Sequence, residues 1–203
     1  AIPICQEQQT AILKAASRGA IYDFTYHRFS TIFHRQGKPL SLSRNIATVF
    51  GVGTLPPAPG TWGSLVALPA FYLIHVAGGF PLVVVATCAM FAFGWWATTE
   101  QTRDSLDHDP SEIVIDEVVG QWLALWTISA SAWRLEIDVL QLWPGWLAGF
   151  ALFRMFDIFK PGPVGWADRR ADALGVMLDD VIAGVCAALC VAAMAVVAHG
   201  VLL

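Results

Sequence analysis

The feature that most constrains this chain is the absence of charge between residues 45 and 99, where there is no Asp, Glu, Lys or Arg. A helix needs about 20 apolar residues to cross a lipid bilayer, so this stretch is long enough for two crossings. The Gly78-Gly79-Phe80-Pro81 sequence would break a helix, because Gly and Pro both disfavour a helix interior. We therefore predict two membrane segments, at residues 62–77 and 81–98.

Three more apolar runs follow, at residues 118–133, 139–153 and 181–203. Only 14% of the residues are charged, whereas a soluble domain carries about 25%. Nine tryptophans also fit the headgroup layers of a membrane. These patterns predict an all-α fold, a polytopic membrane helical bundle with about five membrane segments. The alternative is a large soluble bundle with these runs as core helices, but the last run is too long and too uniformly apolar to favour it.

Lysines and arginines in the loops indicate which ends of the segments face the cytoplasm. Six precede the first segment and three lie between the fourth and fifth: Lys14, Arg18, Arg28, Arg35, Lys38 and Arg44, then Lys160, Arg169 and Arg170. Five crossings put both groups on one side, and the opposite loop at residues 131–138 holds only Arg134. Of the 16 acidic residues, all but Glu136 and Asp138 then lie on the cytoplasmic side.

Residues 1–44 are predicted to form a cytoplasmic N-terminal extension, and residues 45–203 a membrane-embedded domain. No secretory signal opens the extension. Its aromatic residues recur at helical spacing, at Tyr22, Tyr26, Phe29 and Phe33. This spacing is typical of an amphipathic helix lying on the bilayer, and equally of an ordinary helix packed on the bundle.

Two adjacent acidic pairs, Asp116-Glu117 and Asp179-Asp180, lie beside apolar runs on the predicted cytoplasmic side. Charge at the mouth of an apolar helix is costly and is usually functional, and neighbouring carboxylates repel each other unless a cation lies between them. Together with Asp157 these residues offer only oxygen ligands, which favours Mg²⁺, Ca²⁺ or Mn²⁺ over zinc. Mg²⁺ commonly binds carboxylates together with substrate phosphate oxygens, so the pairs indicate phosphoryl chemistry.

Arg154, Asp157 and Lys160 are spaced three residues apart and would share one face of a helix. They form either a ladder of ion pairs or a place where a metal and a phosphate lie side by side. A Gly- and Pro-rich loop at residues 51–64 runs into the first apolar segment. Thr61 is predicted to cap the helix that follows, where free N–H groups attract anions. The alternative for this loop is a rigid turn that enters a membrane helix.

Other phosphoryl-transfer signatures are weak or absent from the sequence. Asp107-His108-Asp109-Pro110-Ser111 mimics an aspartyl nucleophile motif, but that motif normally follows a buried strand, and residues 98–106 are polar and charged. The chain has no Lys-x₆-Arg-Pro, Cys-x₅-Arg or Gly-x₄-Gly-Lys-Ser/Thr motif. Its net charge of -4 also gives no indication of nucleic-acid binding.

Four blocks of the sequence resemble the phosphatidylglycerophosphatase A family: GVGTLPPAPGTWGS at residues 51–64, IVIDEVVGQW at 113–122, FRMFDIFKPGPVGWAD at 153–168 and GVMLDDVIAG at 175–184. The resemblance implies magnesium-dependent hydrolysis of phosphatidylglycerophosphate to phosphatidylglycerol and phosphate in the bacterial inner membrane. Residues 45–203 would be the catalytic domain. The residues to which it assigns roles are Asp116, Glu117, Asp157, Lys160, Asp179 and Asp180, with substrate binding by the loop residues Gly51, Gly53, Thr54, Thr61 and Ser64.

The residues and the resemblance combine into one expected mechanism. Mg²⁺ held by Asp116, Glu117, Asp179 and Asp180 would neutralise the phosphate and activate a water for in-line attack. Arg154 or Lys160 would balance charge on the phosphoryl oxygens, and Asp157 would act as a base or as a further ligand. A covalent aspartyl-phosphate remains open as the alternative route.

The alternative function is a small membrane transporter or ion carrier with an acidic cytoplasmic mouth. A transporter should place ionisable residues near the middle of the membrane, and apart from His75 the predicted segments contain none. The expected partners are therefore the lipid substrate and the bilayer, without nucleic acid, and the sequence does not indicate an oligomeric state.

Overall fold

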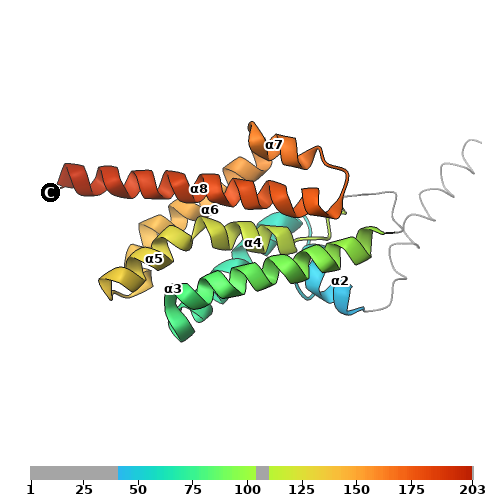
Figure 1. Cartoon of the computed structure of the whole chain (residues 1–203), viewed down its shortest axis with the longest axis horizontal. Coiled ribbons are helices and arrows are strands. Elements are labelled where there is room, and N and C mark those ends of the chain that lie inside the picture. The colour runs from blue at the N-terminus through green and yellow to red at the C-terminus, as the bar shows by residue number, and fades with distance from the viewer. Residues whose placement is uncertain (1–40, 104–109, 203) are drawn as a thin grey trace, which may run out of the picture. The chain divides into compact units, whose positions relative to one another are not determined.

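The computed structural model describes residues 41–103 and 110–202, with side chains to residue 198, and the regular elements in these ranges are all helices (Figure 1). Contacts divide the chain into two units, Ala1–Ser41 and Leu42–Leu203. The predicted amphipathic helix lies outside the described residues, as do most of the predicted extension and the Asp107–Asp109 part of the nucleophile-like motif. Those predictions therefore stay predictions.

The first long helix, α3, is a helical hairpin. After α2 (Leu42–Ala47) and the short 3-10 helix η1 (Val52–Thr54), α3 runs over Pro59–Thr102, but its backbone leaves helical geometry at Gly78 and Gly79. The chain doubles back at this point (Figure 1). Gly79 has a φ of 63°, a conformation that glycine adopts at little cost, and a Cβ there would collide with the Trp133 ring. The two predicted segments with a break between them are confirmed as helices.

The third predicted segment, residues 118–133, consists of two helices. These are α4 (Ile115–Ala124) and α5 (Trp126–Leu135), and the regular helix is interrupted at Leu125. α4 begins before the predicted segment, so Asp116 and Glu117 lie in its first turn. Acidic residues are favourable in a first helical turn because the helix dipole is positive there.

The last two predicted segments are also helical, but with different ends. The 3-10 helix η2 (Val139–Leu142) leads into α6 (Trp143–Phe159), which starts later than residue 139 and continues beyond residue 153. After the short α7 (Pro163–Asp168), α8 (Ala173–Leu202) starts before the predicted residue 181.

The early start of α8 corrects one expectation. Asp179 and Asp180 lie inside this helix and are buried, whereas the sequence placed them at its mouth. Polar residues in the first turns of a helix break an apolar run without breaking the helix, so the apolar pattern alone could not locate this start.

α4 is central to the packing, with α3, α6 and α8 around it. Its contact with α8 depends on two glycines, because a Cβ at Gly184 would collide with the carbonyl oxygen of Gly120. A Cβ at Gly120 would in turn lie 2.7 Å from the carbonyl oxygen of Asp180. The small residues therefore let the two backbones approach closely. This approach brings the acidic residues of α8 beside those of α4.

Two of the described helices, α3 and α8, are long and apolar enough to cross a membrane. Large apolar side chains point outward along them, including Leu73, Val76, Val85, Phe93, Leu189, Val196 and Val197. A water-soluble protein rarely exposes so continuous an apolar surface. Length, composition and outward-facing side chains thus all indicate association with a membrane.

Candidate active site

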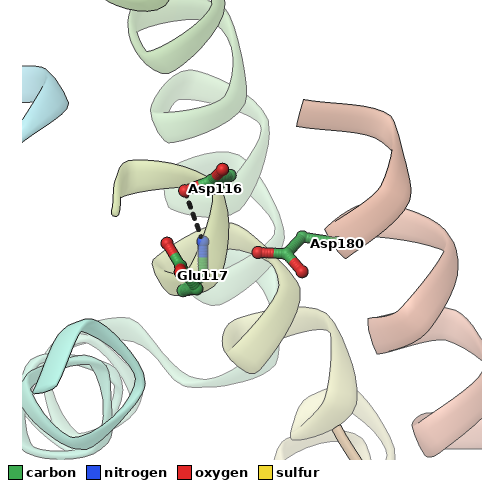
Figure 2. Close-up of side chains that lie close together, drawn as sticks. All are labelled: Asp116, Glu117 and Asp180. Atoms are coloured by element: carbon green, nitrogen blue, oxygen red, sulfur yellow. Dashed lines mark hydrogen bonds between the residues drawn. The ribbon is translucent and has the colours of Figure 1, made fainter. Parts of the chain in front are cut away.

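Asp116 and Glu117 of α4 and Asp180 of α8 form a carboxylate triplet, in which one oxygen from each residue lies within 4.8 Å of the others. Figure 2 shows Asp180 reaching from α8 toward the first turn of α4. Asp116 and Asp180 are buried, at 6% and 3% exposure. The sequence predicted that these three residues would meet, and the structure brings them together.

Backbone hydrogen bonds set the direction of the acidic side chains. Asp116 Oδ1 accepts a hydrogen bond from the N–H of Glu117 at 3.0 Å (Figure 2). In α8 the same arrangement recurs, since Asp179 Oδ1 accepts from the N–H of Asp180 at 2.9 Å. In each pair the first carboxylate is bonded by the N–H of the second residue.

Glu117 has the least compensated carboxylate of the triplet. Its Oε2 is buried and has no hydrogen-bond partner among the described residues. The negative charges of Asp180 and Asp157 lie close to it, as does the positive charge of Arg154. Carboxylate oxygens held this close together away from water fit a hard divalent cation, which would supply the missing positive charge.

The start of α3 closes over Glu117 without placing a side chain there. A Cβ at Gly60 would collide with Glu117 Oε1 and lie 3.2 Å from Arg154 Nη1. The Glu117 carboxylate can therefore occupy this position only because residue 60 is glycine. Gly60 was not among the predicted site residues, although it lies in the Gly- and Pro-rich loop that was singled out.

Arg154 brings a positive charge from α6 to the same place. Its Nη1 lies 2.6 Å from Asp157 Oδ2 and donates to Ser64 Oγ at 3.5 Å. Its Nε is buried and has no partner among the described residues. The carboxylate of Asp157 is close enough to interact with that of Asp180, so the Arg154–Asp157 ion pair lies directly beside the triplet.

Lys160 is held away from the triplet by two other carboxylates. It ends α6 in a left-handed conformation, pairs with Asp168 of α7, and its Nζ lies 2.7 Å from Asp179 Oδ2. Burial lowers the pKa of Lys160, but the hydrogen bonds to Asp168 and Asp179 outweigh it and raise the pKa above its usual value. The structure thus directs Asp179 to Lys160, and not into the triplet with which it was predicted to act.

Asp168 is a residue that the sequence analysis did not single out. It lies eight positions after Lys160, beyond the end of α6, so no helical spacing connects the two. Its position at the end of the block at residues 153–168 was the available signal.

Of the predicted loop residues, some contact the site and others stabilise the loop itself. Ser64 is fully buried and contacts Arg154. Gly51 has a φ of 92°, and its carbonyl accepts from Thr54 Oγ1 at 2.7 Å, so these two stabilise the turn itself. Gly53 is buried, and a Cβ there would collide with the carbonyl of Glu112.

The predicted capping role of Thr61 is wrong. α3 begins at Pro59 with Ala58 as its N-cap residue, and no side chain caps it. Proline is favourable at the first position of a helix because its missing N–H needs no partner there. The helix therefore starts before Thr61, which lies inside its first turn.

Similarity to known proteins shows the family to which the chain belongs. The family model for phosphatidylglycerophosphatase A matches residues 45–195. This chain belongs to the phosphatidylglycerophosphatase A family. The match covers the triplet, Arg154, Asp157, Lys160 and the Gly- and Pro-rich loop.

Two bacterial relatives carry the name of this family, and a third carries a different name. Phosphatidylglycerophosphatase A of Haemophilus influenzae is 36% identical over 148 residues, which is 72% of this chain and 84% of the relative. The protein of the same name from Escherichia coli is 34% identical over 145 residues, 70% of this chain and 77% of the relative. A Bacteroides thetaiotaomicron protein, provisionally named a phosphatidylinositol-3-phosphatase, is 36% identical over 153 residues, 73% of this chain and 90% of the relative. No solved structure matches the chain.

Proposed function

We propose that this chain hydrolyses the terminal phosphate monoester of phosphatidylglycerophosphate, releasing phosphatidylglycerol and phosphate. The observation that carries the proposal is the buried carboxylate triplet with Arg154 beside it, in a member of the phosphatidylglycerophosphatase A family. A phosphate monoester needs cationic compensation and an activated water, and this site has residues suited to both.

Asp116, Glu117 and Asp180 would hold Mg²⁺. The fit rests on the all-oxygen donor set and on the buried, unpartnered Glu117 Oε2. When bound, the ion would supply positive charge for the phosphoryl oxygens and lower the pKa of a water. Asp179, which we predicted from sequence as a further ligand, would instead keep Lys160 in place.

Arg154 is the residue that would grip the phosphoryl group. Its guanidinium is a planar fork that can bind two oxygens at once, and Asp157 and Ser64 already fix one of its nitrogens. Asp157 would therefore orient Arg154, and Gly60 would let the Glu117 carboxylate lie beside the Arg154 guanidinium. This assignment uses water as the nucleophile; the aspartyl-phosphate alternative would need one triplet carboxylate to leave the cation and attack phosphorus.

The fold also suits a lipid substrate. The hairpin halves of α3, the α4–α5 pair, α6 and α8 would make five crossings, and the triplet lies near the end of the bundle where α4 starts. The acyl chains could remain in one leaflet while the headgroup enters the site. From the Lys and Arg distribution, this end would face the cytoplasm of a bacterial inner membrane. Acids gathered near one end also disfavour a transporter, which needs ionisable groups along its path.

The test is phosphate release by the purified chain from phosphatidylglycerophosphate in mixed micelles, with Mg²⁺ or with a chelator. We expect release with Mg²⁺, its loss with the chelator, and at least about 100-fold lower kcat for Asp180→Asn. Asp138→Asn, a matched change at the exposed cap of η2, should leave kcat unchanged. Phosphatidylinositol-3-phosphate is the competing substrate, and faster release from it would contradict the proposal.

A further inference from the structure

Gln121 is a buried amide that nothing in the described structure satisfies. Its side chain is fully buried, and neither Oε1 nor Nε2 has a hydrogen-bond partner among the described residues. Burying an unpaired amide costs stability, so buried polar groups in native proteins are nearly always bonded. A bound molecule that completes the hydrogen bonds would explain such an exception.

The position of Gln121 connects it to the candidate site. It follows Glu117 by four residues in α4, and residues with this spacing lie one above the other on the same helix face. Long side chains in a helix lean toward its N-terminus and cover the preceding turn. The amide of Gln121 is therefore directed toward the turn that carries Asp116 and Glu117.

The neighbouring helix is also part of the site. Trp122 Nε1 donates to the carbonyl oxygen of Ala67 at 2.9 Å, which holds this turn of α4 against the first half of α3. That half begins with Gly60 and Ser64, the two residues that meet Glu117 and Arg154. Gln121 thus lies one turn deeper in α4 than Glu117, in a part of the helix that packs against α3.

Three of the buried side chains without partners are chemically complementary. Glu117 Oε2 accepts hydrogen bonds, Arg154 Nε donates, and the Gln121 amide does both. A phosphoryl oxygen can satisfy Arg154, but only a group that both donates and accepts can satisfy the amide. A water molecule does so, and a neutral amide can orient a water without competing for its proton.

We propose that Gln121 is a positioning residue that orients the water attacking phosphorus. The proposal rests on the proposed function, because it assumes a phosphoryl group between Arg154 and the triplet. In the step, the water oxygen forms the new bond to phosphorus while the ester oxygen leaves with the bonding electron pair. One proton of the water passes to a carboxylate and the lipid oxygen takes up a proton, so the balance is one water for one ester bond. Gln121 gives up and gains no proton.

The test compares Gln121→Met with the wild type in the purified full chain. Methionine has a similar volume and no hydrogen-bonding amide, so the fold should tolerate it. We expect kcat to fall at least about tenfold, with KM within about threefold and the thermal midpoint unchanged or raised, since an unsatisfied buried group has been removed. Thr98→Val is the matched control, because Thr98 is also fully buried with an unpartnered hydroxyl but lies in the second half of α3. It should keep wild-type kcat.

A second measurement separates this proposal from the choice of substrate. Orthovanadate with Mg²⁺ can take a fifth oxygen ligand and so mimics the five-coordinate phosphorus under attack by water, whereas inorganic phosphate stays tetrahedral and resembles the product. Gln121→Met should weaken orthovanadate binding at least about tenfold and phosphate binding by less than about threefold. If Gln121→Met weakens orthovanadate binding as expected but the wild type does not hydrolyse phosphatidylglycerophosphate, the proposed substrate is wrong and the role of Gln121 stands. Unchanged kcat and orthovanadate affinity, or a kcat that falls only together with the thermal midpoint, would overturn the proposal.

Discussion

At the scale of single residues, both members of the α4 acidic pair enter the triplet as expected, whereas only one member of the α8 pair does. Adjacent residues on a helix point about 100° apart, because a turn contains about 3.6 residues. Asp180 faces α4, so Asp179 faces elsewhere and meets Lys160. The sequence predicted that carboxylates would gather here; which member of the α8 pair enters the triplet depends on the packing of α8 against α4, which residue types alone do not specify.

Arg154 and Lys160 differ in how they are held, and this predicts a difference in function. Arg154 has a buried, unpartnered Nε beside the triplet, whereas Lys160 is already paired with two carboxylates. We expect Arg154→Lys to lower kcat by about 10- to 150-fold, since a lost charge-assisted contact is worth roughly 1.5–3 kcal/mol. Lys160→Arg should retain much more activity because either cation can pair with Asp168 and Asp179. The measurement is kcat in mixed micelles at saturating Mg²⁺, and a silent Arg154→Lys beside an inactive Lys160→Arg would mean that the two roles are reversed.

Gly60 offers a second test at this scale. A methyl group there would collide with Glu117 Oε1, so Gly60→Ala should remove most of the activity. Its thermal stability should not fall in proportion, because alanine favours a helix over glycine by about 1 kcal/mol. Gly145→Ala in α6 is the control, since its Cβ would come no closer than 3.2 Å to the Ile128 side chain. Equal kcat for the two variants would show that the space beside Glu117 is not used.

At the scale of helices, the contact between α4 and α8 determines whether the triplet can form. A Cβ at Gly184 would meet the backbone of Gly120 and lie 3.0 Å from Leu123 Cβ, and backbone atoms cannot rotate out of the way. Gly184→Ala should therefore push α8 outward and carry Asp180 away from Glu117, so that the Mg²⁺ concentration for half-maximal activity rises. Val185→Leu adds bulk to the exposed side of the same turn and should leave that concentration unchanged. A wild-type Mg²⁺ dependence in Gly184→Ala would contradict this coupling.

The start of α8 provides a prediction about pH. Asp172 Oδ1 accepts from the N–H of Gly175 at 2.8 Å, and the ion pair with Arg170 lowers the pKa of Asp172 below its usual value. A lowered pKa in the folded state adds stability above the usual carboxyl pKa, and this stability is lost as pH falls through the lowered value. The thermal midpoint of unfolding in detergent should therefore fall slightly at acid pH, and this fall should be absent in Asp172→Asn. Because Asp172 is half exposed, the effect should shrink with added salt; identical pH profiles for the two proteins would refute the assignment.

At the scale of the whole molecule, the apolar runs were a good guide to the helices and a poor guide to their ends. The hairpin of α3 was predictable because Gly78 and Gly79 interrupt a long uncharged stretch. The start of α8 was not, because the acidic residues in its first turns end the apolar run without ending the helix. The interruption at Leu125 was not, because an apolar residue at this point gives no sign of a break. The grouping of acids at one end followed from counting crossings, whereas the contacts with Asp168 and Gly60 depend on tertiary packing.

The side of the membrane that each helix end faces determines whether the site can reach its lipid substrate. It also predicts the outcome of reporter fusions. If the hairpin of α3, the α4–α5 pair, α6 and α8 make five crossings, the start of α4 and the end of α6 share one side, and the turn after α5 and the C-terminal end of α8 share the other. Lys160, Arg169 and Arg170 lie on the first side and Arg134 on the second, so the first side should be cytoplasmic.

A periplasm-active reporter inserted between Leu135 and Val139, or fused after Leu203, should therefore be active, and a cytoplasm-active reporter at either point should be silent. A reporter inserted in the connection between α6 and α7 should give the opposite result, which provides the internal control. Cytoplasmic signals at both of the first two points would remove the crossing count. The triplet would then no longer be expected to lie within reach of a lipid headgroup in the cytoplasmic leaflet. Its own geometry would be unchanged.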